Sequence, residues 1–292
     1  MRWKDGRRSN NVEDRRGQKP AFSGGGGGSP LLQLLPLLLS GRLGKAGMVV
    51  VVVLLALSYF GGGNTGSGLS GQQGGSQATS PAEDELVDFM AVVLGDTEET
   101  WHQLFRQHNL SYQEPRLLLF TGAVQSACGH AQSAMGPFYC SGDRRVYIDL
   151  SFFQDLRDRY QAAGDFAQAY VLAHEVGHHV QHLLGTLDKV HRQQANLGKA
   201  QANALSVKLE LQADCYAGIW AHHADRSRQL LEAGDLEEAL RAAAAIGDDR
   251  LQQQSRGYVT PESFTHGTSE QRMHWFNVGK QQGTLAACDT FR

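Results

Sequence analysis

The sequence predicts a mainly helical α+β protein with a small antiparallel sheet and one transmembrane helix near its N-terminus. Three observations lead to this prediction. Apolar residues recur at helical spacing over much of the chain after residue 80, two short runs rich in β-branched and aromatic residues indicate strands, and an earlier apolar run carries no charge. With 292 residues, 41% of them hydrophobic, the chain can build one sizeable core plus attachments.

The first 45 residues differ in charge from the rest of the chain. They hold nine Lys/Arg and three Asp/Glu, a balance of +6, which leaves 18 against 27, a balance of -9, for the remainder. Because residues 1–45 are basic and the part before the Gly24–Gly28 run has few apolar groups, they are predicted to form a disordered cytoplasmic tail. A nucleic-acid-binding arm is the alternative. Trp3 and Phe22 are its only aromatic residues before that run's end, so no nucleic-acid partner is expected.

Residues 46–63 are the predicted transmembrane anchor. The uncharged segment AGMVVVVVLLALSYF is shorter than the roughly 20 apolar residues that usually span a bilayer, so flanking glycines or local bilayer thinning must help. The earlier Leu31–Leu39 run is interrupted by Gln33 and Pro36, which favours an interfacial stretch over a second span.

The charges around the anchor predict its orientation. Arg42 and Lys45 precede it, and the Gly/Ser-rich residues 64–79, a predicted flexible linker, follow it. The positive-inside rule then predicts a single-pass inner-membrane protein with its N-terminus in the cytoplasm and residues 80–292 in the periplasm or outside the cell. A cleaved signal peptide ending near Ala56–Ser58 is the alternative, but that leader would be unusually long.

Residues 80–292 are predicted to form the folded domain. Ser80 and Glu83 have the spacing of a capping box at a helix start, and helices are expected over Glu85–Leu94 and Thr97–His108. Further short helices are expected over Leu236–Ala245 and Gly247–Gly257. The predicted strands are Leu117–Thr121 and Arg144–Leu150. The second strand either offers a free edge to an extended peptide or is paired on both sides.

The segment Tyr170–Leu184 contains the pattern H-E-x-x-H, formed by His174, Glu175 and His178. On an α-helix, residues four apart lie on one face, so both imidazoles can bind the same metal ion. Zinc held by two histidines needs a third protein ligand and an open position for water, and Glu175 is placed to take a proton from that water. This chemistry is that of a zinc peptidase.

A second acidic pair follows in Lys208–Tyr216, where Glu210 and Asp214 are again four apart. If this helix packs against the first, Glu210 becomes the third zinc ligand. Asp214 can then accept a hydrogen bond from a ligating histidine and fix its tautomer. The alternative is a solvated helix face, which the apolar neighbours Leu209 and Leu211 argue against.

These motifs resemble a known family. HEVGHH followed by ELQAD resembles the gluzincin metallopeptidases, and MRW, NVEDRR, GPFYC, RVYIDLSFF and ACDTF look like the bacterial membrane-anchored "putative neutral zinc metallopeptidase" family. The resemblance covers nearly the whole chain and implies a zincin-like domain with Zn²⁺ as its cofactor. The segment from His266 to Arg272 resembles the His-to-Arg segment that borders the cleft in some gluzincins. His266 is therefore expected to stabilise the oxyanion, with a helix cap as its alternative role.

The four cysteines fit an exported domain, because disulfides persist in oxidising compartments. Cys128 and Cys140 are predicted to close a short loop, and Cys215 and Cys288 to tie the C-terminal tail to the second ligand helix. Four cysteines allow three pairings, so this remains one of three. A cysteine-rich metal site is disfavoured since the sequence has no C-x-x-C.

Together these features predict a zinc-dependent peptidase, an endopeptidase, acting on peptide or protein substrates. His174, His178 and Glu210 would hold zinc, and Glu175 would act as general base. A catalytically silent zinc-binding scaffold or assembly factor is the competing hypothesis. A hydrolase of other amide bonds, such as those of cell-wall peptides, also stays open, because the sequence shows no specificity pocket and does not indicate the oligomeric state.

Overall fold

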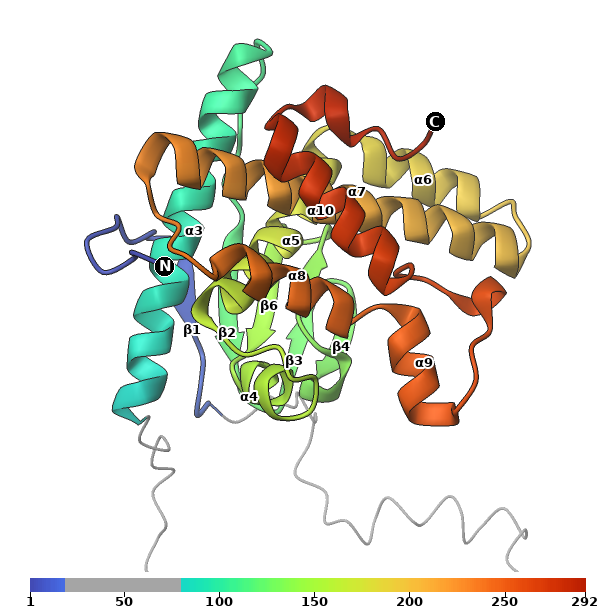
Figure 1. Cartoon of the computed structure of the whole chain (residues 1–292), viewed down its shortest axis with the longest axis horizontal. Helices are drawn as coiled ribbons and strands as arrows, with labels where there is room; N and C mark the ends of the chain where they lie inside the picture. Colours follow the sequence, from blue (N-terminus) through green and yellow to red (C-terminus); the bar gives the residue numbers. More distant parts are fainter. Residues whose placement is uncertain (19–79) are drawn as a thin grey trace, which may run out of the picture. The chain divides into compact units, whose positions relative to one another are not determined.

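The computed structural model describes residues 1–18 and 80–292, which belong to one compact unit (Figure 1). The predicted anchor at 46–63, the linker at 64–79 and the Leu31–Leu39 stretch lie outside the described residues. No helix within the described ranges combines the length and the apolar character that crossing a membrane requires.

The main sheet is mixed, which corrects the predicted small antiparallel sheet. Its strand order is β1-β2-β6-β5, with β1, β2 and β6 mutually parallel and β5 antiparallel to β6. A separate pair, β3 and β4, is antiparallel. The strands are β1 (Val12–Asp14), β2 (Arg116–Phe120), β3 (Ala123–Ser126), β4 (Gly129–Gln132), β5 (Phe138–Cys140) and β6 (Arg145–Asp149).

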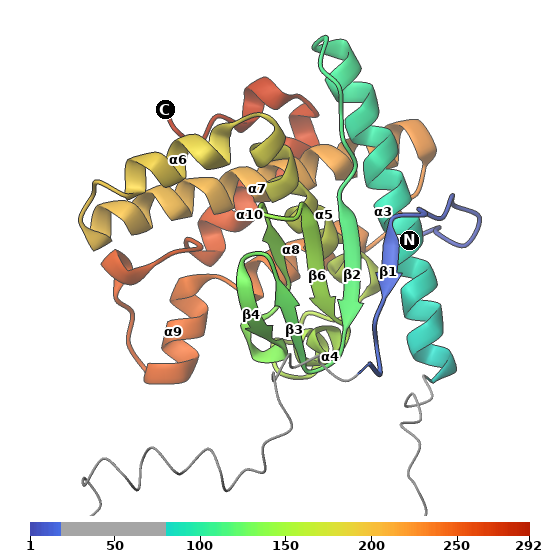
Figure 2. The ribbon, with the colours of Figure 1, turned by 180° about the vertical axis from the view of Figure 1, so that it is seen from behind.

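Both faces of the main sheet are buried. Leu117 and Leu119 of β2 pack into the large core that the helices share, whereas Leu118 and Phe120 pack against the β3–β4 pair. This explains why β2 is a continuous apolar run rather than an alternating one. Figure 2 shows the strands in front of α5 and its neighbouring helices.

The helices form most of the domain. The predicted helices at 85–94 and 97–108 are one continuous helix, α3, because Gly95 lies within it without breaking it. The Ser80–Glu83 capping box is confirmed at its start, as are the two short helices after residue 234. The helices are α3 (Pro81–Gln107), α4 (Ser151–Asp158), α5 (Asp165–Leu183), α6 (Thr186–Gln194), α7 (Lys199–Arg228), α8 (Asp235–Ala245), α9 (Asp248–Arg256) and α10 (Ser269–Gln282).

Helices α5, α7 and α10 approach one another closely at glycines. A Cβ on Gly177 of α5 would lie 3.0 Å from the carbonyl oxygen of Ala213 in α7. A Cβ on Gly279 of α10 would lie only 1.9 Å from the carbonyl oxygen of Cys215. The absence of side chains at these positions therefore brings the three helix backbones together around one point.

Residues 1–18 pack on the domain, so the prediction of a disordered tail is wrong for this part. The Met1 ammonium group lies 2.8 Å from Asp165 and 3.4 Å from Asp235, and Trp3 packs edge-on against Phe89 of α3. At Gly95, an added Cβ would lie 2.5 Å from the carbonyl oxygen of Arg7, so this glycine admits the backbone of the segment.

The basic residues of this segment pair with acidic residues of α3, which a local charge count cannot reveal. The buried Glu98 carboxylate accepts hydrogen bonds from Arg7 Nη2 at 2.6 Å, Ser9 Oγ at 2.5 Å and Asn11 Nδ2 at 2.9 Å. Arg8 forms an ion pair with Asp88. The further ion pairs to α3 are Lys4–Glu85 and Arg16–Asp84.

The pairing of β1 with β2 also bears on membrane topology. Val12 lies opposite Leu117, and Asp14 lies opposite Leu119. Hydrogen-bonded strands lie side by side, so residues 1–18 belong to the same folded body as residues 80–292. The predicted topology, with the N-terminus in the cytoplasm and the domain beyond a single crossing, would have to separate these two strands, and it stays a prediction.

The predicted cysteine pairing and both predicted strands are confirmed. Cys128 bonds to Cys140 and Cys215 bonds to Cys288. The strand that was considered as a free edge, β6, is paired on both sides, and β5 forms the edge of the sheet.

Candidate metal centre

The first two predicted ligands lie on α5. This helix begins directly after Gly164, whose φ of 129° few other residues adopt, and it contains no proline. His174 is buried, and the side chain of His178 is 15% exposed, so one turn of the helix presents both imidazoles to the same cleft.

Glu210 of α7 meets both imidazoles. His174 Nε2 lies 3.2 Å from Glu210 Oε2, and His178 Nε2 lies 3.4 Å from Glu210 Oε1. One ligand atom from each of the three residues falls within 4.8 Å of the others. The structure therefore brings together the three predicted ligands, in a geometry that fits a single metal ion with Nε2 of each histidine facing it.

Asp214 holds the other side of the His174 ring. Its Oδ1 lies 2.8 Å from His174 Nδ1 and also accepts the Tyr170 hydroxyl proton at 2.5 Å. Arg272 of α10 donates to both carboxylate oxygens, Nε to Oδ2 and Nη2 to Oδ1, each at 2.9 Å. With Nδ1–H donating to Asp214, the Nε2 lone pair of His174 is directed at the metal position.

Arg272, Tyr170 and Gln181 were not assigned these roles from the sequence. The sequence indicates Arg272 only as the end of the His-to-Arg segment, whereas in the structure it is 1% exposed and forms an ion pair with Asp214. Gln181 is fully buried and its Oε1 lies 2.9 Å from His178 Nδ1. Its position three residues after His178, on the same helix face, is the one sequence signal that could have indicated it.

The acidic neighbours control the protonation of the two imidazoles. Burial alone would lower the pKa of His174, but Asp214 and Glu210 outweigh it and raise the pKa to about 10. Burial would likewise lower the pKa of His178, but Glu210 outweighs this effect and the pKa of His178 is raised. Burial would raise the pKa of Glu210, yet the two histidines hold it well below the usual range. This centre is therefore built to hold positive charge.

Glu175 is in a different electrostatic setting from Glu210. It is 8% exposed and lines the same cleft as both histidines. Burial raises the pKa of its carboxyl, and the nearby histidines oppose that effect only in part. A carboxylate with a raised pKa beside a metal position is suited to accept and return a proton.

The cleft has a volume of about 840 Å³ and is bordered by the sheet edge. Phe138 and Tyr139 of β5 form part of its lining, together with Met135 and Leu209. Tyr139 is fixed to α5, because its hydroxyl lies 2.9 Å from His179 Nδ1. The free edge of β5 is thus placed beside the helix that carries the histidines.

His266 also lines this cleft, with its side chain 50% exposed. Asp248 at the start of α9 holds its loop, because Oδ2 accepts the backbone N–H groups of Thr265 at 2.7 Å, His266 at 2.6 Å and Gly267 at 3.0 Å. The hydrogen bond with Asp248 raises the pKa of His266. The sequence offered no signal for Asp248, since acidic residues are common at helix starts.

A second acidic cluster in the described part of the chain, Asp165 with Asp235 and Glu238, has spacing that could suit a cation. The Met1 ammonium group already lies against Asp165 and Asp235. Its positive charge accounts for this cluster without a metal ion.

The donor set at the cleft is that of the two-histidine, one-glutamate class of zinc metallopeptidases, with an acid beside the first histidine. The chain belongs to the family described as "Putative neutral zinc metallopeptidase", whose model matches residues 1–291. It is 50% identical over 297 residues to "Uncharacterized protein YpfJ" of Escherichia coli strain K12, covering 100% of this chain and 99% of that protein. It is 42% identical over 228 residues to "Uncharacterized protein Mb2605" of Mycobacterium bovis, covering 74% of this chain and 75% of that one. No solved structure matches significantly.

Proposed function

We propose that the protein is a zinc-dependent endopeptidase with a zincin-like catalytic domain. The observation that supports this most strongly is the meeting of His174, His178 and Glu210 beside the buried Glu175. Zinc bound there would polarise the peptide carbonyl and lower the pKa of a bound water to about 7.

Glu175 would act as general base and then as general acid. It would take a proton from the water that attacks the peptide carbonyl carbon, and it would deliver that proton to the amine nitrogen as the C–N bond breaks. The raised pKa of Glu175 supports both steps, because a carboxyl group that titrates closer to neutrality accepts and returns a proton readily.

The edge of β5 would bind the substrate. An extended peptide can pair with a free strand edge through its main chain, and β5 borders the cleft at Phe138 and Tyr139. Main-chain pairing needs no free peptide terminus, which favours cleavage of internal bonds. His266, held by Asp248 across this cleft, would stabilise the oxyanion that forms on the carbonyl.

We further propose that residues 1–18 and 80–292 share an oxidising compartment outside the cytoplasm. Two disulfides and the β1–β2 pairing support this placement. Because the four cysteines are all paired, a single cysteine can be introduced at the exposed Asn10 or, in a second variant, at the exposed Gln254 of α9. An impermeant maleimide should label both variants in intact spheroplasts. Labelling of only one of them would contradict the shared compartment.

The full-length protein is the right material for testing catalysis, because residues 1–18 are part of the fold. Its metal content and its cleavage of a peptide library should be compared with those of Glu175→Gln. We expect stoichiometric zinc in both proteins, and a loss of cleavage of about 100-fold to 10⁴-fold in the variant, the range for a lost general base. A zinc-bound wild type that cleaves nothing would favour the competing hypothesis, a silent zinc-binding scaffold.

A further inference from the structure

The second zinc-ligand candidate, His178, is oriented by a chain of amide side chains. Gln181 Oε1 lies 2.9 Å from His178 Nδ1, on the side of the ring opposite the metal position. Gln181 Nε2 donates to the Leu209 carbonyl oxygen at 2.7 Å and to Gln212 Oε1 at 3.1 Å. Gln181 thus joins α5 to α7 directly beside Glu210.

The Cys288 carbonyl group determines the direction of the hydrogen bonds that Gln212 and Gln181 make with each other and with His178. The Cys288 backbone carbonyl can only accept, so the Gln212 side chain must present its NH₂ group there, at 2.9 Å. Gln212 Oε1 then faces Gln181 and accepts from its NH₂ group. This leaves Gln181 Oε1 facing His178, so Nδ1 carries a proton and Nε2, which faces Glu210, is the ring nitrogen that becomes available to the metal.

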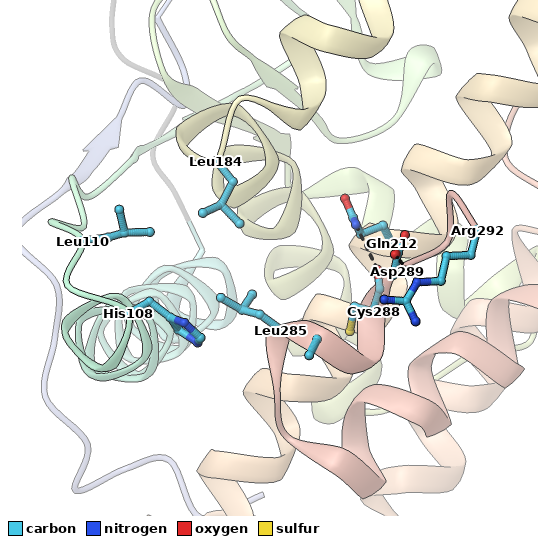
Figure 3. A pocket seen from close by; sticks show the side chains of 9 residues that line it. His108, Leu110, Leu184, Gln212, Leu285, Cys288, Asp289 and Arg292 are labelled. Carbon is cyan, nitrogen blue, oxygen red and sulfur yellow. Dashed lines mark hydrogen bonds and ion pairs between the residues drawn. The ribbon is translucent and has the colours of Figure 1, made fainter.

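The far end of the chain of amides is held by the C-terminal tail. The Cys215–Cys288 disulfide ties the tail to α7, and Thr290 Oγ1 donates to the Lys208 carbonyl oxygen at 2.7 Å. Figure 3 shows Gln212 beside Cys288 and Asp289 at the wall of a pocket of about 560 Å³, formed by the tail with the ends of α3 and α5. The hydrogen-bonded series Cys288–Gln212–Gln181–His178, called the amide relay below, therefore runs from this second pocket to the metal position.

We propose that Gln181 is a positioning residue for the metal centre, and that Gln212 and the disulfide-held tail orient it. The proposal rests on the proposed zinc site but not on peptide cleavage. Both amides are buried, Gln181 at 0% and Gln212 at 6% exposure, so water does not replace a lost partner freely. Loss of the relay frees the His178 ring to rotate or to adopt the other tautomer, and either change weakens metal binding.

The test is zinc affinity, measured by competition with a chelator on the full-length protein. Gln181→Met keeps the length of the side chain but removes the acceptor and both donors. We expect the zinc dissociation constant to rise about 10-fold to 100-fold, the usual effect of losing a partner of a ligating histidine. Gln212→Met should give a smaller rise. Gln193→Met, the same change at an exposed position on α6, should leave the constant unchanged.

Two further measurements separate positioning from a general loss of structure. The visible spectrum of the Co²⁺-loaded protein should change in Gln181→Met, because the spectrum reports ligand geometry, and it should stay unchanged in Gln193→Met. Urea unfolding of each metal-free variant gives the stability loss independently. If Gln181→Met lowers stability while its zinc affinity and Co²⁺ spectrum match those of the wild type, Gln181 is a packing residue and the proposal is wrong. A wild type that binds zinc but cleaves no peptide would overturn the proposed function alone.

Discussion

Charged side chains stabilise both the metal centre and the N-terminal segment, but their surroundings differ between the two regions. At the metal centre, His174, Asp214 and Arg272 form one buried network in which each group has a charged or polar partner. In the N-terminal segment, the basic residues pair one at a time with carboxylates of α3, and only Glu98 is deeply buried among those partners. The comparison teaches that burial, more than the number of ion pairs, decides what a charge contributes.

The largest loss of stability is expected for removal of Arg272, the buried partner of Asp214. Arg272→Met would remove the guanidinium that donates to both oxygens of the buried Asp214 carboxylate, so we expect a loss of about 3–5 kcal/mol in the free energy of unfolding of the metal-free protein. Urea denaturation measures this. Arg241→Met, at an exposed position on α8, is the matched control and should unfold like the wild type. Equal stability of the two variants would refute the distinction between buried and exposed charges.

Glu98 is the position where the N-terminal segment most resembles the metal centre. Glu98→Gln removes a charge that accepts from Arg7, Ser9 and Asn11, and we expect a loss of about 1.5–3 kcal/mol, the range for a hydrogen bond to a charged group. Hydrogen exchange should accelerate at the β1–β2 amides, with zinc affinity unchanged.

Glu99→Gln is the control for Glu98→Gln, because Glu99 is the next residue on α3 and is exposed. If Glu98→Gln also weakened zinc binding, the two regions would have to be treated as one coupled unit. A result confined to β1 and β2 would show that they are independent.

The two regions also explain what could be predicted from the sequence. His174, Glu175 and His178 occur within one helical turn, so their geometry follows from the helix period alone. Glu210 and Asp214 repeat that spacing and required only that α7 pack on α5. The N-terminal segment has no such local rule. Its partners Glu98 and Leu117 lie far along the chain, so its charges were interpreted as those of a solvated tail.

The same reasoning accounts for the parts of the fold that were missed. An apolar run such as β2 predicts a strand but does not indicate which strands lie beside it. Its parallel partner β1 precedes it by about 100 residues in the sequence, so no local pattern links the two. Likewise, Arg272 and Asp248 act through distant loops and helices, so their spacing carries no signal. Both side chains are buried by contacts between segments that are far apart in the sequence.

Zinc binding at the metal centre should depend on pH. Burial would lower the pKa values of both histidines, but Asp214 and Glu210 raise that of His174 to about 10, and Glu210 raises that of His178. Protonated His174 therefore stabilises the metal-free fold fully below its unfolded pKa of about 6.5, and this contribution is lost as pH rises through about 10. Zinc must displace these protons, so its affinity should rise about tenfold per pH unit for each proton released.

Calorimetry in two buffers of different ionisation enthalpy counts those protons directly. Near neutral pH we expect up to two protons to be released per zinc bound, one from His174 and one from His178. No release would show that the histidines are already neutral in the metal-free protein.

The smallest effect is expected at Arg8. Its Nη2 lies 2.6 Å from Asp88 Oδ2, but the two side chains are 43% and 42% exposed, so water and salt screen the pair. Arg8→Gln should therefore leave the urea midpoint unchanged at physiological ionic strength, although the ion pair is as short as the one between Arg7 and Glu98. A loss as large as that of Glu98→Gln would mean that bond length, rather than burial, determines how strongly the segment is held.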